Sequence, residues 1–469
     1  MNKLQQKILV LVLLSTTLFA NTTTPNAVVK VFASISLPDY QYPWQTSRIS
    51  KFTGSGAVIG DNRILTSAHV VSGARFIEVK KENDPKKYIA TVKYISHQPD
   101  LAILEVEDKS FFTGVSPLKL NDNIEARDKV TVLGYPLGGN SISNTTGIIS
   151  RIEYRSYVWS REYLLAIQID AAINSGNSGG PVVNDKNELV GIAMMKLKNS
   201  SNIGYIVPTT VINAFLEDIK DGVVDGFHKD TILIQHINND ALKEFYALGD
   251  RTGILVTDVG KDEKAIRVED IILAIDNKSI ANNGTVKTKY GHINFNIAFH
   301  EKQIGQSVKL KILRDKKEIT IEYAVKKVTP LIYQEFGKEP RYILYGGFAF
   351  TPLTKNNLSK NNKSSTALKM VLYEKSKIED YHEAVSSMST IFPNKVNRGY
   401  YAGSYILDKV NGIKVKSFKH LVELLDNIDD EFTVFDFLEK NKIILNTKEA
   451  KDSLDSVMKI YNLKSDRRE

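Results

Sequence analysis

The feature that most constrains the fold is a series of short Val- and Ile-rich runs between Ala27 and Leu216. Gly, Asn and Asp, which favour turns, separate the runs. The runs are "AVVKVFASI", "GSGAVIG", "RFIEVKK", "YIATVKYI", "LAILEV", "KVTVLGY", "LLAIQID", "ELVGIAMM" and "IGYIVP". Many short strands at regular spacing predict an all-β barrel or sandwich, because each strand must bury one face against another layer.

The rest of the chain divides into further units. A helix is predicted over residues 208–222, "PTTVINAFLEDIKDG", where apolar residues recur at helical spacing between a threonine cap and a final glycine. We place a domain boundary there. Residues 228–330 and 331–469 mix strands with short helices, and "TPLI" marks the boundary between them. A chain of 469 residues has room for about three domains at roughly 150 residues each.

The first twenty residues have the pattern of a cleaved secretory signal. Lys3 and Lys7 precede an apolar run from Ile8 to Ala20. This run is too short to span a bilayer, and it ends at a small residue before a polar stretch. Residues 1–20 are therefore predicted to be a signal peptide, with an uncleaved anchor as the alternative. We expect export to the periplasm and no stable membrane span.

Composition excludes several classes of site. The chain has no cysteine, which rules out disulfides, thiol catalysis and zinc–thiolate centres. The net charge of +8 is spread over segments of mixed sign such as "VKKENDPKK", which predicts a solvated surface rather than a nucleic-acid groove. The sequence has no phosphate loop, ligand cluster or dinucleotide fingerprint. We expect no cofactor and no metal.

Three short motifs suggest chemistry. His69 lies in "LTSAHV" and Asp100 in "HQPDLAILEV". Taken alone, the first is more often a structural histidine and the second a turn residue. The third motif, "GNSGG", contains Gly176, Asn177 and Ser178, whose N–H groups can be turned toward one point, as an oxyanion site requires. The alternative for Ser178 is a turn residue in a tight glycine loop.

Together the motifs predict a catalytic triad. Ser178 supplies a nucleophilic oxygen, and His69 takes its proton and returns it to the leaving amine. Asp100 holds the histidine tautomer and stabilises the imidazolium. The three residues occur in this order inside one β-rich segment. We predict nucleophilic acyl transfer, with an oxyanion hole formed by the N–H groups of Gly176, Asn177 and Ser178.

The segment resembles the trypsin-fold serine proteases and, within them, the Deg/HtrA proteins. The motifs that carry the resemblance are "GSGAVI", "ILTSAHVV", "PDLAILEV", "VLGYPLGG", "IQIDAAINSGNSGGPVVN" and "NIGYIVP". The stretches "AVVKVFASISLPDYQYPWQ" and "IANNGTV" and the third unit resemble the Deg subgroup of plant organelles. This resemblance implies a mainly β protein: a trypsin-like double β-barrel over 21–222, then two PDZ-like α+β domains over 228–330 and 331–469.

The resemblance also implies an activity. It predicts an ATP-independent serine endopeptidase that degrades misfolded or damaged proteins and works as a homo-oligomer, a trimer or a multiple of trimers. Peptides are expected partners of the PDZ-like domains. Two alternatives stay open: a chaperone-like scaffold that binds clients while the triad is mostly idle, and a processing protease of narrow specificity.

Substrate preference follows from three residues around the nucleophile motif. A basic P1 residue needs a buried carboxylate in the pocket, because an unpaired buried cation is costly. The matching position, six residues before Ser178, is Ala172, and Ile173 and Ile192 are assigned to the same pocket. We therefore expect an apolar pocket that favours medium aliphatic side chains.

Regulation is expected to differ from that of the digestive proteases. Those enzymes carry an acidic residue before the serine, which pairs with a newly cut N-terminus. The neutral Asn177 stands here, so we expect no activation by zymogen cleavage. The candidate sensor is "RIEYRSYVWSREYLL" (151–165), and its alternative is a solvated hairpin.

The two PDZ-like units differ in their candidate peptide loops. "RVEDIILAIDNKSI" resembles a PDZ strand pair, and a weak repeat relates 270–280 to 405–415. "DTILI" (230–234) has Leu233 where a glycine is usual, so carboxylate capture is not expected there, whereas "LYGGFAF" (344–350) is a better match. The resemblance further implies that an aromatic N-terminal segment builds the trimer, against the alternative of packing on its own barrel. Its residues are Val31, Phe32, Tyr40, Tyr42 and Trp44.

Overall fold

The computed structural model describes residues 26–469 except 138, 140, 197–202, 230–231, 261–262 and 359–381. The predicted signal peptide, residues 1–20, lies outside the described residues and stays a prediction. The chain forms two compact units. The first runs up to Phe32 and takes in Thr53–Val70 and Ile77–Asn213, and the second comprises Ala33–Phe52, Val71–Phe76 and Ala214–Glu469.

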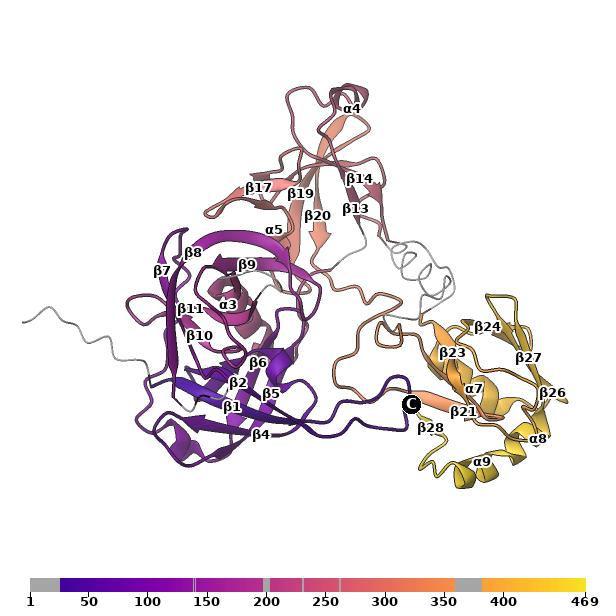
Figure 1. Ribbon diagram of the computed structural model, residues 1–469. Coiled ribbons are helices and arrows are strands. Elements are labelled where there is room, and N and C mark those ends of the chain that lie inside the picture. Colours follow the sequence, from indigo (N-terminus) through magenta and orange to yellow (C-terminus); the bar gives the residue numbers. More distant parts are fainter. Residues whose placement is uncertain are drawn as a thin grey trace, which may run out of the picture. The chain divides into compact units, whose positions relative to one another are not determined.

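The β-rich segment closes into two barrels within the described residues, each of six antiparallel strands (Figure 1). This arrangement confirms the predicted trypsin-like fold. In order around the first barrel, the strands are β1 (Val28–Ile35), β2 (Ser50–Ile59), β3 (Arg63–Thr66), β6 (Leu101–Val106), β5 (Tyr88–Ser96) and β4 (Ala74–Lys81). In the second they are β10 (Pro181–Val183), β11 (Leu189–Lys196), β12 (Gly204–Pro208), β9 (Tyr163–Ile169), β8 (Ser143–Ser156) and β7 (Lys129–Gly134).

Short helical segments follow several of the barrel strands. The single-turn α2 (Ala68–Val71) follows β3, and the 3-10 turn η1 (Lys109–Phe112) follows β6. The predicted helix after the second barrel is present as α3 (Thr209–Asp218) and the 3-10 turn η2 (Ile219–Asp221). It ends at Gly222, whose φ of 91° is a left-handed conformation that glycine adopts without strain.

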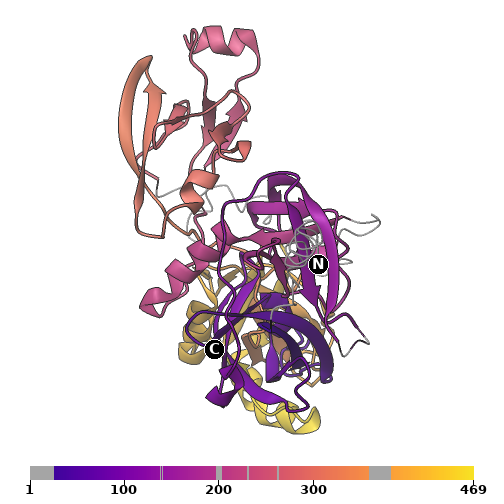
Figure 2. The same ribbon diagram turned by 90° about the vertical axis from the view of Figure 1, so that its left-hand side faces the viewer.

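Residues 228–330 form an open antiparallel sheet with short helices, with α4 at one end of it in both views (Figures 1 and 2). The sheet order is β13-β14-β15-β19-β20, with β16 paired to β15. The strands are β13 (Leu233–His236), β14 (Ile254–Asp258), β15 (Ile271–Ile275), β16 (Lys278–Ser279), β19 (Ser307–Arg314) and β20 (Lys317–Ala324). The hairpin β17 (Thr285–Thr288) and β18 (Gly291–Asn294) and the helices α4 (Asp240–Phe245) and α5 (Ile297–His300) complete the unit.

Residues 331–469, called the C-terminal domain below, have two four-stranded sheets and three helices in their described part. One sheet has the order β23 (Val385–Ile391), β22 (Phe348–Pro352), β21 (Tyr342–Tyr345) and β28 (Arg467–Arg468). The other has the order β25 (Ile413–Lys414), β24 (Leu407–Val410), β26 (Phe432–Phe437) and β27 (Lys442–Asn446). The helices are α7 (Phe418–Asn427), α8 (Thr447–Asp452) and α9 (Leu454–Ile460).

The weak repeat between the two later units corresponds to a pair of tight hairpins. Strand β15 turns into β16 through Asp276 and Asn277, with φ values of 43° and 64°. Strand β24 turns into β25 through Asn411 and Gly412, with φ values of 46° and 79°. Two-residue turns with positive φ at both positions favour Asn, Asp and Gly, which is why the sequence showed the repeat.

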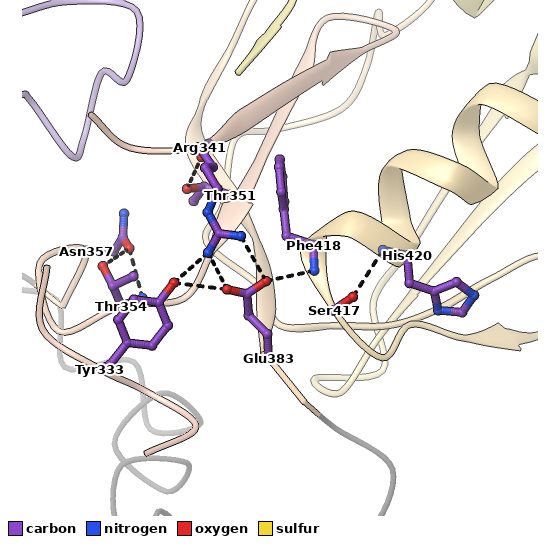
Figure 3. A network of polar contacts seen from close by, with 9 residues as sticks. All are labelled: Tyr333, Arg341, Thr351, Thr354, Asn357, Glu383, Ser417, Phe418 and His420. Carbon is purple, nitrogen blue, oxygen red and sulfur yellow. Dashed lines mark hydrogen bonds and ion pairs between the residues drawn. The ribbon is translucent and has the colours of Figure 1, made fainter. Parts of the chain in front are cut away.

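A charged network organises the start of α7 in the C-terminal domain (Figure 3). The Glu383 carboxylate forms an ion pair with Arg341 and accepts a hydrogen bond from the Tyr333 hydroxyl at 2.9 Å. It also accepts the Phe418 backbone N–H at 3.0 Å, which is one of the unpaired donors at the beginning of this helix. The side chains of Arg341 and Glu383 are only 29% and 13% exposed, so the network is largely withdrawn from water.

The segment between β1 and β2 packs on the C-terminal domain. The Trp44 ring lies 4.9 Å from that of Phe392 and 5.8 Å from that of Tyr342, measured between centroids. The Arg468 side chain donates a hydrogen bond to the Pro43 carbonyl at 2.9 Å, and the Tyr40 hydroxyl donates to the Lys338 carbonyl at 2.9 Å.

This packing agrees with neither expectation for the whole aromatic segment. Val31 is buried in strand β1 of the first barrel, as the alternative predicted. Trp44 instead has intrachain partners in the C-terminal domain, a contact that no local pattern could indicate. A trimer contact by these residues stays a prediction. The predicted domain limits also stay predictions, although residues 33–52 group with the second unit, which resumes at Ala214 rather than after Gly222.

Candidate active site

His69 and Asp100 lie side by side in the first barrel. His69 is in the one-turn α2, directly after β3, and Asp100 precedes β6 in a turn where its φ of 57° is left-handed. The Asp100 carboxylate lies 2.7 Å from His69 Nδ1 and accepts the His69 backbone N–H at 2.9 Å. The carboxylate has no exposed surface, whereas the histidine side chain is 26% exposed. The pair therefore orients the imidazole and leaves one edge accessible.

Electrostatics favour a proton on this imidazole. Burial by itself lowers the pKa of His69, but the charge of Asp100 and its hydrogen bond outweigh burial and raise the pKa above the usual value of 6.5. A more basic imidazole is a stronger proton acceptor, and it is also protonated at a higher pH. This balance suits a general base that works near neutral pH.

Ser178 lies in the loop between β9 and β10. Its hydroxyl is within 3.4 Å of the Met194 carbonyl, which is a long contact. Among the described residues no hydrogen bond joins this hydroxyl to His69. The structure thus brings together the His69–Asp100 pair, and shows Ser178 in a conformation in which its hydroxyl is not engaged with the imidazole.

Glycines are required by the tight course of the nucleophile loop. Gly176 and Gly179 have φ values of 100° and 80°. A Cβ at Gly176 would lie 2.3 Å from the Tyr135 carbonyl oxygen, and one at Gly179 would lie 2.3 Å from the Thr66 hydroxyl. Both the backbone conformation and the close neighbours therefore exclude a larger residue.

Two backbone N–H groups of this loop are available to an oxyanion. Gly176 and Ser178 donate no hydrogen bond to any described residue, whereas the Asn177 N–H donates to the Asn174 carbonyl at 2.9 Å. In this conformation the i to i−3 turn takes up the Asn177 N–H, and the contribution of Asn177 to the hole stays a prediction. The peptide units that contain the two free N–H groups are oriented by hydrogen bonds to their carbonyls. The Leu137 N–H donates to the Ser175 carbonyl, and the Gly180 N–H donates to the Asn177 carbonyl.

The Asn177 side chain is a buried amide without partners. It is 1% exposed, and neither its oxygen nor its nitrogen has a hydrogen-bond partner among the described residues. Such groups are rare because no hydrogen bond offsets the free-energy cost of removing them from water. The position where digestive proteases carry an acid thus holds a neutral amide that has no hydrogen-bond partner in the described part of the chain. That zymogen cleavage is not the switch stays a prediction.

The predicted pocket residues differ in accessibility. Ala172 has accessible surface, Ile173 is 3% exposed and Ile192 has none. Ile192 lies in β11 between Pro181 of β10 and Val207 of β12, inside the second barrel's sheet. The side chain of Ile173 packs against Gly204, where a Cβ would meet it at 2.8 Å. In this conformation Ile192 does not line an open pocket, because the sheet buries it.

The candidate sensor segment is the β8–β9 hairpin, and its tip contacts the loop that carries Asp100. Trp159 donates its indole N–H to His97 at 3.2 Å, and its ring centroid lies 6.0 Å from that of His69. The Ser160 hydroxyl donates to the Gln98 carbonyl at 2.8 Å. Trp159 and Ser160 at the hairpin tip are therefore packed against the loop that carries Asp100, whereas Val158 between β8 and Trp159 is exposed. Sequence reasoning selected this segment for its aromatic content but missed the contact of Trp159 with His69.

The peptide loops of the PDZ-like units take different forms. "LYGGFAF" forms the β21–β22 hairpin, and β22 is paired on its other side with β23. Both edges of β22 are therefore occupied, which leaves no edge for an added peptide strand. In the first unit, β13 pairs only with β14 within the described part of the chain. Residues 230–231 of the predicted "DTILI" loop lie outside the described residues.

The described residues contain no group of three or more His, Asp or Glu side chains placed to hold a metal ion. Among the same residues, no helix has both the length and the apolar character needed to cross a membrane.

Comparison with protein families matches two parts of the chain. A profile described as "Trypsin-like peptidase domain" matches residues 54–192, and one described as "PDZ domain" matches residues 331–469. "Protease Do-like 2, chloroplastic" from Arabidopsis thaliana is 35% identical over 453 residues, which cover 94% of this chain and 74% of that protein. "Protease Do-like 4, mitochondrial" from the same plant is 36% identical over 448 residues, covering 94% of this chain and 84% of that protein.

Solved structures show the same fold. "HtrA-type protease AlgW with tripeptide" has a TM-score of 0.52 and 24% identity, and the match covers 66% of this chain and 95% of that one. Together with the Do-like relatives, whose similarity extends over nearly the whole chain, the two barrels and the PDZ region show that this protein belongs to the Deg/HtrA family of trypsin-like serine proteases.

Proposed function

We propose that this serine protease is an exported, ATP-independent endopeptidase that degrades misfolded or damaged proteins through His69, Asp100 and Ser178. The observation that carries the proposal is the paired His69 and Asp100 together with a nucleophile loop whose Gly176 and Ser178 N–H groups lack acceptors. Free donors beside a serine are what a tetrahedral oxyanion requires.

The reaction proceeds by acyl transfer. Ser178 Oγ attacks the peptide carbonyl carbon while its proton passes to His69 Nε2, and the carbonyl oxygen becomes an oxyanion bound by the Gly176 and Ser178 N–H groups. His69 then protonates the leaving amine, the C–N bond breaks, and an acyl-enzyme remains. A water molecule, deprotonated by the same imidazole, attacks the ester, and the returning proton restores Ser178. Asp100 stabilises the imidazolium in both halves.

The substrate class is proposed from the site. No carboxylate is assigned to the pocket positions, so a medium aliphatic P1 side chain at Ala172 and Ile173 is favoured. Mass spectrometry of the fragments of a denatured substrate tests this assignment. Mostly Val, Ala, Ile or Leu before the cut supports it, and mostly Arg or Lys overturns it.

The test of the proposed activity compares the wild-type protein with Ser178→Ala on unfolded casein. Wild type should yield many fragments, and the variant should be slower by about a million-fold, because the nucleophile is lost while the fold is kept. Equal fragmentation by both proteins would show that a contaminant or another residue is responsible. A single cut, with casein otherwise intact, would favour a processing protease of narrow specificity.

One observation favours a second candidate, the client-binding scaffold with an idle triad. The Ser178 hydroxyl contacts the Met194 carbonyl rather than His69, as expected of a resting enzyme. Suppression of the aggregation of an unfolded client by both wild type and Ser178→Ala, without fragments from either at several temperatures, would support it.

Localisation and assembly are proposed on other grounds. Lys3, Lys7 and the apolar run after them support export to the periplasm, whereas the named relatives are chloroplastic and mitochondrial. Membership of the Deg/HtrA family supports a homo-oligomer built from trimers and peptide binding by the PDZ region. Light scattering with and without unfolded casein measures the assembly, and a mass of one chain under both conditions would contradict it.

A further inference from the structure

Ser55 of β2 joins the first barrel to the nucleophile loop of the second. Its side chain has no exposed surface. The hydroxyl donates a hydrogen bond to the Gly176 carbonyl at 2.8 Å and accepts one from the Tyr135 N–H, also at 2.8 Å. One hydroxyl thus uses its single proton on the nucleophile loop and a lone pair on the segment that follows β7.

The backbone of Ser55 makes a second connection to the same loop. Its N–H donates to the Ser178 carbonyl at 2.9 Å, and its own carbonyl accepts the Thr66 hydroxyl at 2.7 Å. Two carbonyls of the nucleophile loop, on Gly176 and Ser178, are therefore fixed by one residue that is more than a hundred positions away in the chain.

These two carbonyls flank the peptide units that carry the free donors. The Gly176 carbonyl belongs to the peptide unit that follows the Gly176 Cα. The free Gly176 N–H belongs to the peptide unit that precedes the same Cα. Gly176 has a φ of 100° and has no side chain to limit rotation, so its orientation depends on hydrogen bonds. The Leu137 N–H holds the preceding carbonyl, and Ser55 holds the following one.

The packing around the hydroxyl admits little rearrangement. A Cβ at Gly134 would lie 2.9 Å from Ser55 Oγ, and one at Gly180 would lie 3.1 Å from Ser55 Cβ. The Ser55 hydroxyl, the Gly176 carbonyl and the Tyr135 N–H are all buried. Removal of the hydroxyl leaves the Gly176 carbonyl and the Tyr135 N–H without partners at the point where the loop must be held.

We propose that Ser55 is a positioning residue for the proteolytic reaction, which holds the Gly176 N–H of the nucleophile loop in the orientation that receives the oxyanion. Ser55 does not touch the substrate and acts through the Gly176 carbonyl. The inference rests on the proposed function, since it assigns the Gly176 N–H to that step.

The first test is the rate of hydrolysis of a fluorogenic peptide with an aliphatic P1 residue. Removing one oxyanion donor outright costs about a hundred- to a thousandfold in kcat, so loosening it in Ser55→Ala should lower kcat about ten- to a hundredfold. KM should stay within twofold. The matched control is Ser67→Ala, which deletes another fully buried hydroxyl, whose one hydrogen bond among the described residues is a long one to the Ala193 carbonyl at 3.5 Å. Its kcat should stay within twofold of wild type.

The second test separates positioning from a general loss of structure. A peptide boronate forms a tetrahedral adduct that uses the oxyanion hole, whereas the matching product peptide does not. Ser55→Ala should lower the affinity for the boronate by about the same factor as it lowers kcat. It should lower the affinity for the product peptide less than twofold. Ser55→Cys replaces the hydroxyl by a somewhat larger thiol that forms a weaker hydrogen bond, and it should give an intermediate kcat. If Ser55→Ala fails to fold, the kcat of Ser55→Cys tests the inference in its place.

Three results would overturn the inference: Ser55→Ala and Ser55→Cys with wild-type kcat, an equal loss in Ser55→Ala and Ser67→Ala, or an equal loss of boronate and product affinity. Each of these leaves the proposed function intact, because the wild type is active. A wild-type protein that neither cleaves the peptide nor binds the boronate contradicts the proposed function itself, and with it the inference.

Discussion

The nucleophile loop and the C-terminal PDZ domain both bury polar groups, but they treat them differently. In the loop, the N–H groups of Gly176 and Ser178 have no acceptor among the described residues, and both polar atoms of the Asn177 amide lack a partner. In the C-terminal domain, the Glu383 carboxylate contacts a guanidinium, a hydroxyl and a helix N–H.

The difference separates a region built for chemistry from one built for stability. Unpaired buried groups cost free energy and persist only where the surrounding structure fixes them. A fully partnered network stabilises one arrangement and leaves nothing for a substrate to bind. We therefore expect substitutions near Ser178 to change rates more than stability, and substitutions in the Glu383 network to do the reverse.

After Ser178→Ala, the largest effect is expected from Asp100→Asn. The amide removes the charge that stabilises the imidazolium and favours the wrong histidine tautomer, so kcat should fall by about ten-thousandfold. Peptide hydrolysis under saturating substrate measures it, and Asp108→Asn, at an exposed carboxylate of the same barrel, is the control. A loss of kcat of less than tenfold would mean that Asp100 takes no part in the reaction, and would contradict the view that the region around Ser178 serves catalysis.

The pH profile is the next test. The pKa of His69 is raised above 6.5, and the neutral form is the base, so kcat/KM should rise about tenfold per unit up to that pKa and then level. Stability runs the other way. A raised folded-state pKa stabilises the fold below the unfolded value, and this contribution is lost as the pH rises through the folded pKa. An inflection at or below 6.5 would contradict the assignment of His69.

In the C-terminal domain, Glu383→Gln should lower stability by about 2 kcal/mol, because Arg341 loses its charge partner in a partly buried site. The protein has two tryptophans, so Trp44 fluorescence in a Trp159→Phe background reports urea unfolding of this domain. Glu423→Gln, at an exposed side chain of α7, is the control. A lower kcat in Glu383→Gln with unchanged stability would contradict the role of this network in stability.

The smallest effect is expected from Trp44→Ala. The indole is half-buried against Phe392 and Tyr342, and its loss should lower the stability of the C-terminal domain by about 1–2 kcal/mol. Scanning calorimetry should show an earlier transition for this domain, with kcat unchanged. Tyr401→Ala removes an aromatic side chain that is 91% exposed and should have no effect. Identical transitions in both variants would mean that Trp44 does not stabilise this domain.

The features predictable from the sequence are those encoded over a few residues. The alternation of Val and Ile with turn residues predicted the strands that close into barrels, and the two-residue turns at Asp276 and Asn411 predicted the matching hairpins. The "GNSGG" spacing predicted a loop that only glycine can follow, as the φ of Gly176 confirms. The distances between His69 and Asp100 agree with the predicted pairing, while their catalytic roles stay predictions.

The features that the sequence left open depend on contacts between distant segments. The loss of the Asn177 N–H to an internal turn, the burial of Ile192 and the paired edges of β22 all follow from backbone hydrogen bonds that motif spacing does not specify. The signal for Ser55 was present in "GSGAVI", but nothing in that stretch names its partners.

The sequence by itself determined the turns, the strand-forming segments and the identity of the residues able to do acyl-transfer chemistry, because these depend on local backbone sterics and side-chain reactivity. Only the tertiary structure decided that Ser55 reaches Gly176, that Trp159 covers the Asp100 loop and that Trp44 packs on the C-terminal domain. These contacts join residues far apart in the chain, and their geometry arises from the packing of whole barrels and sheets, whose detail no short window of sequence contains.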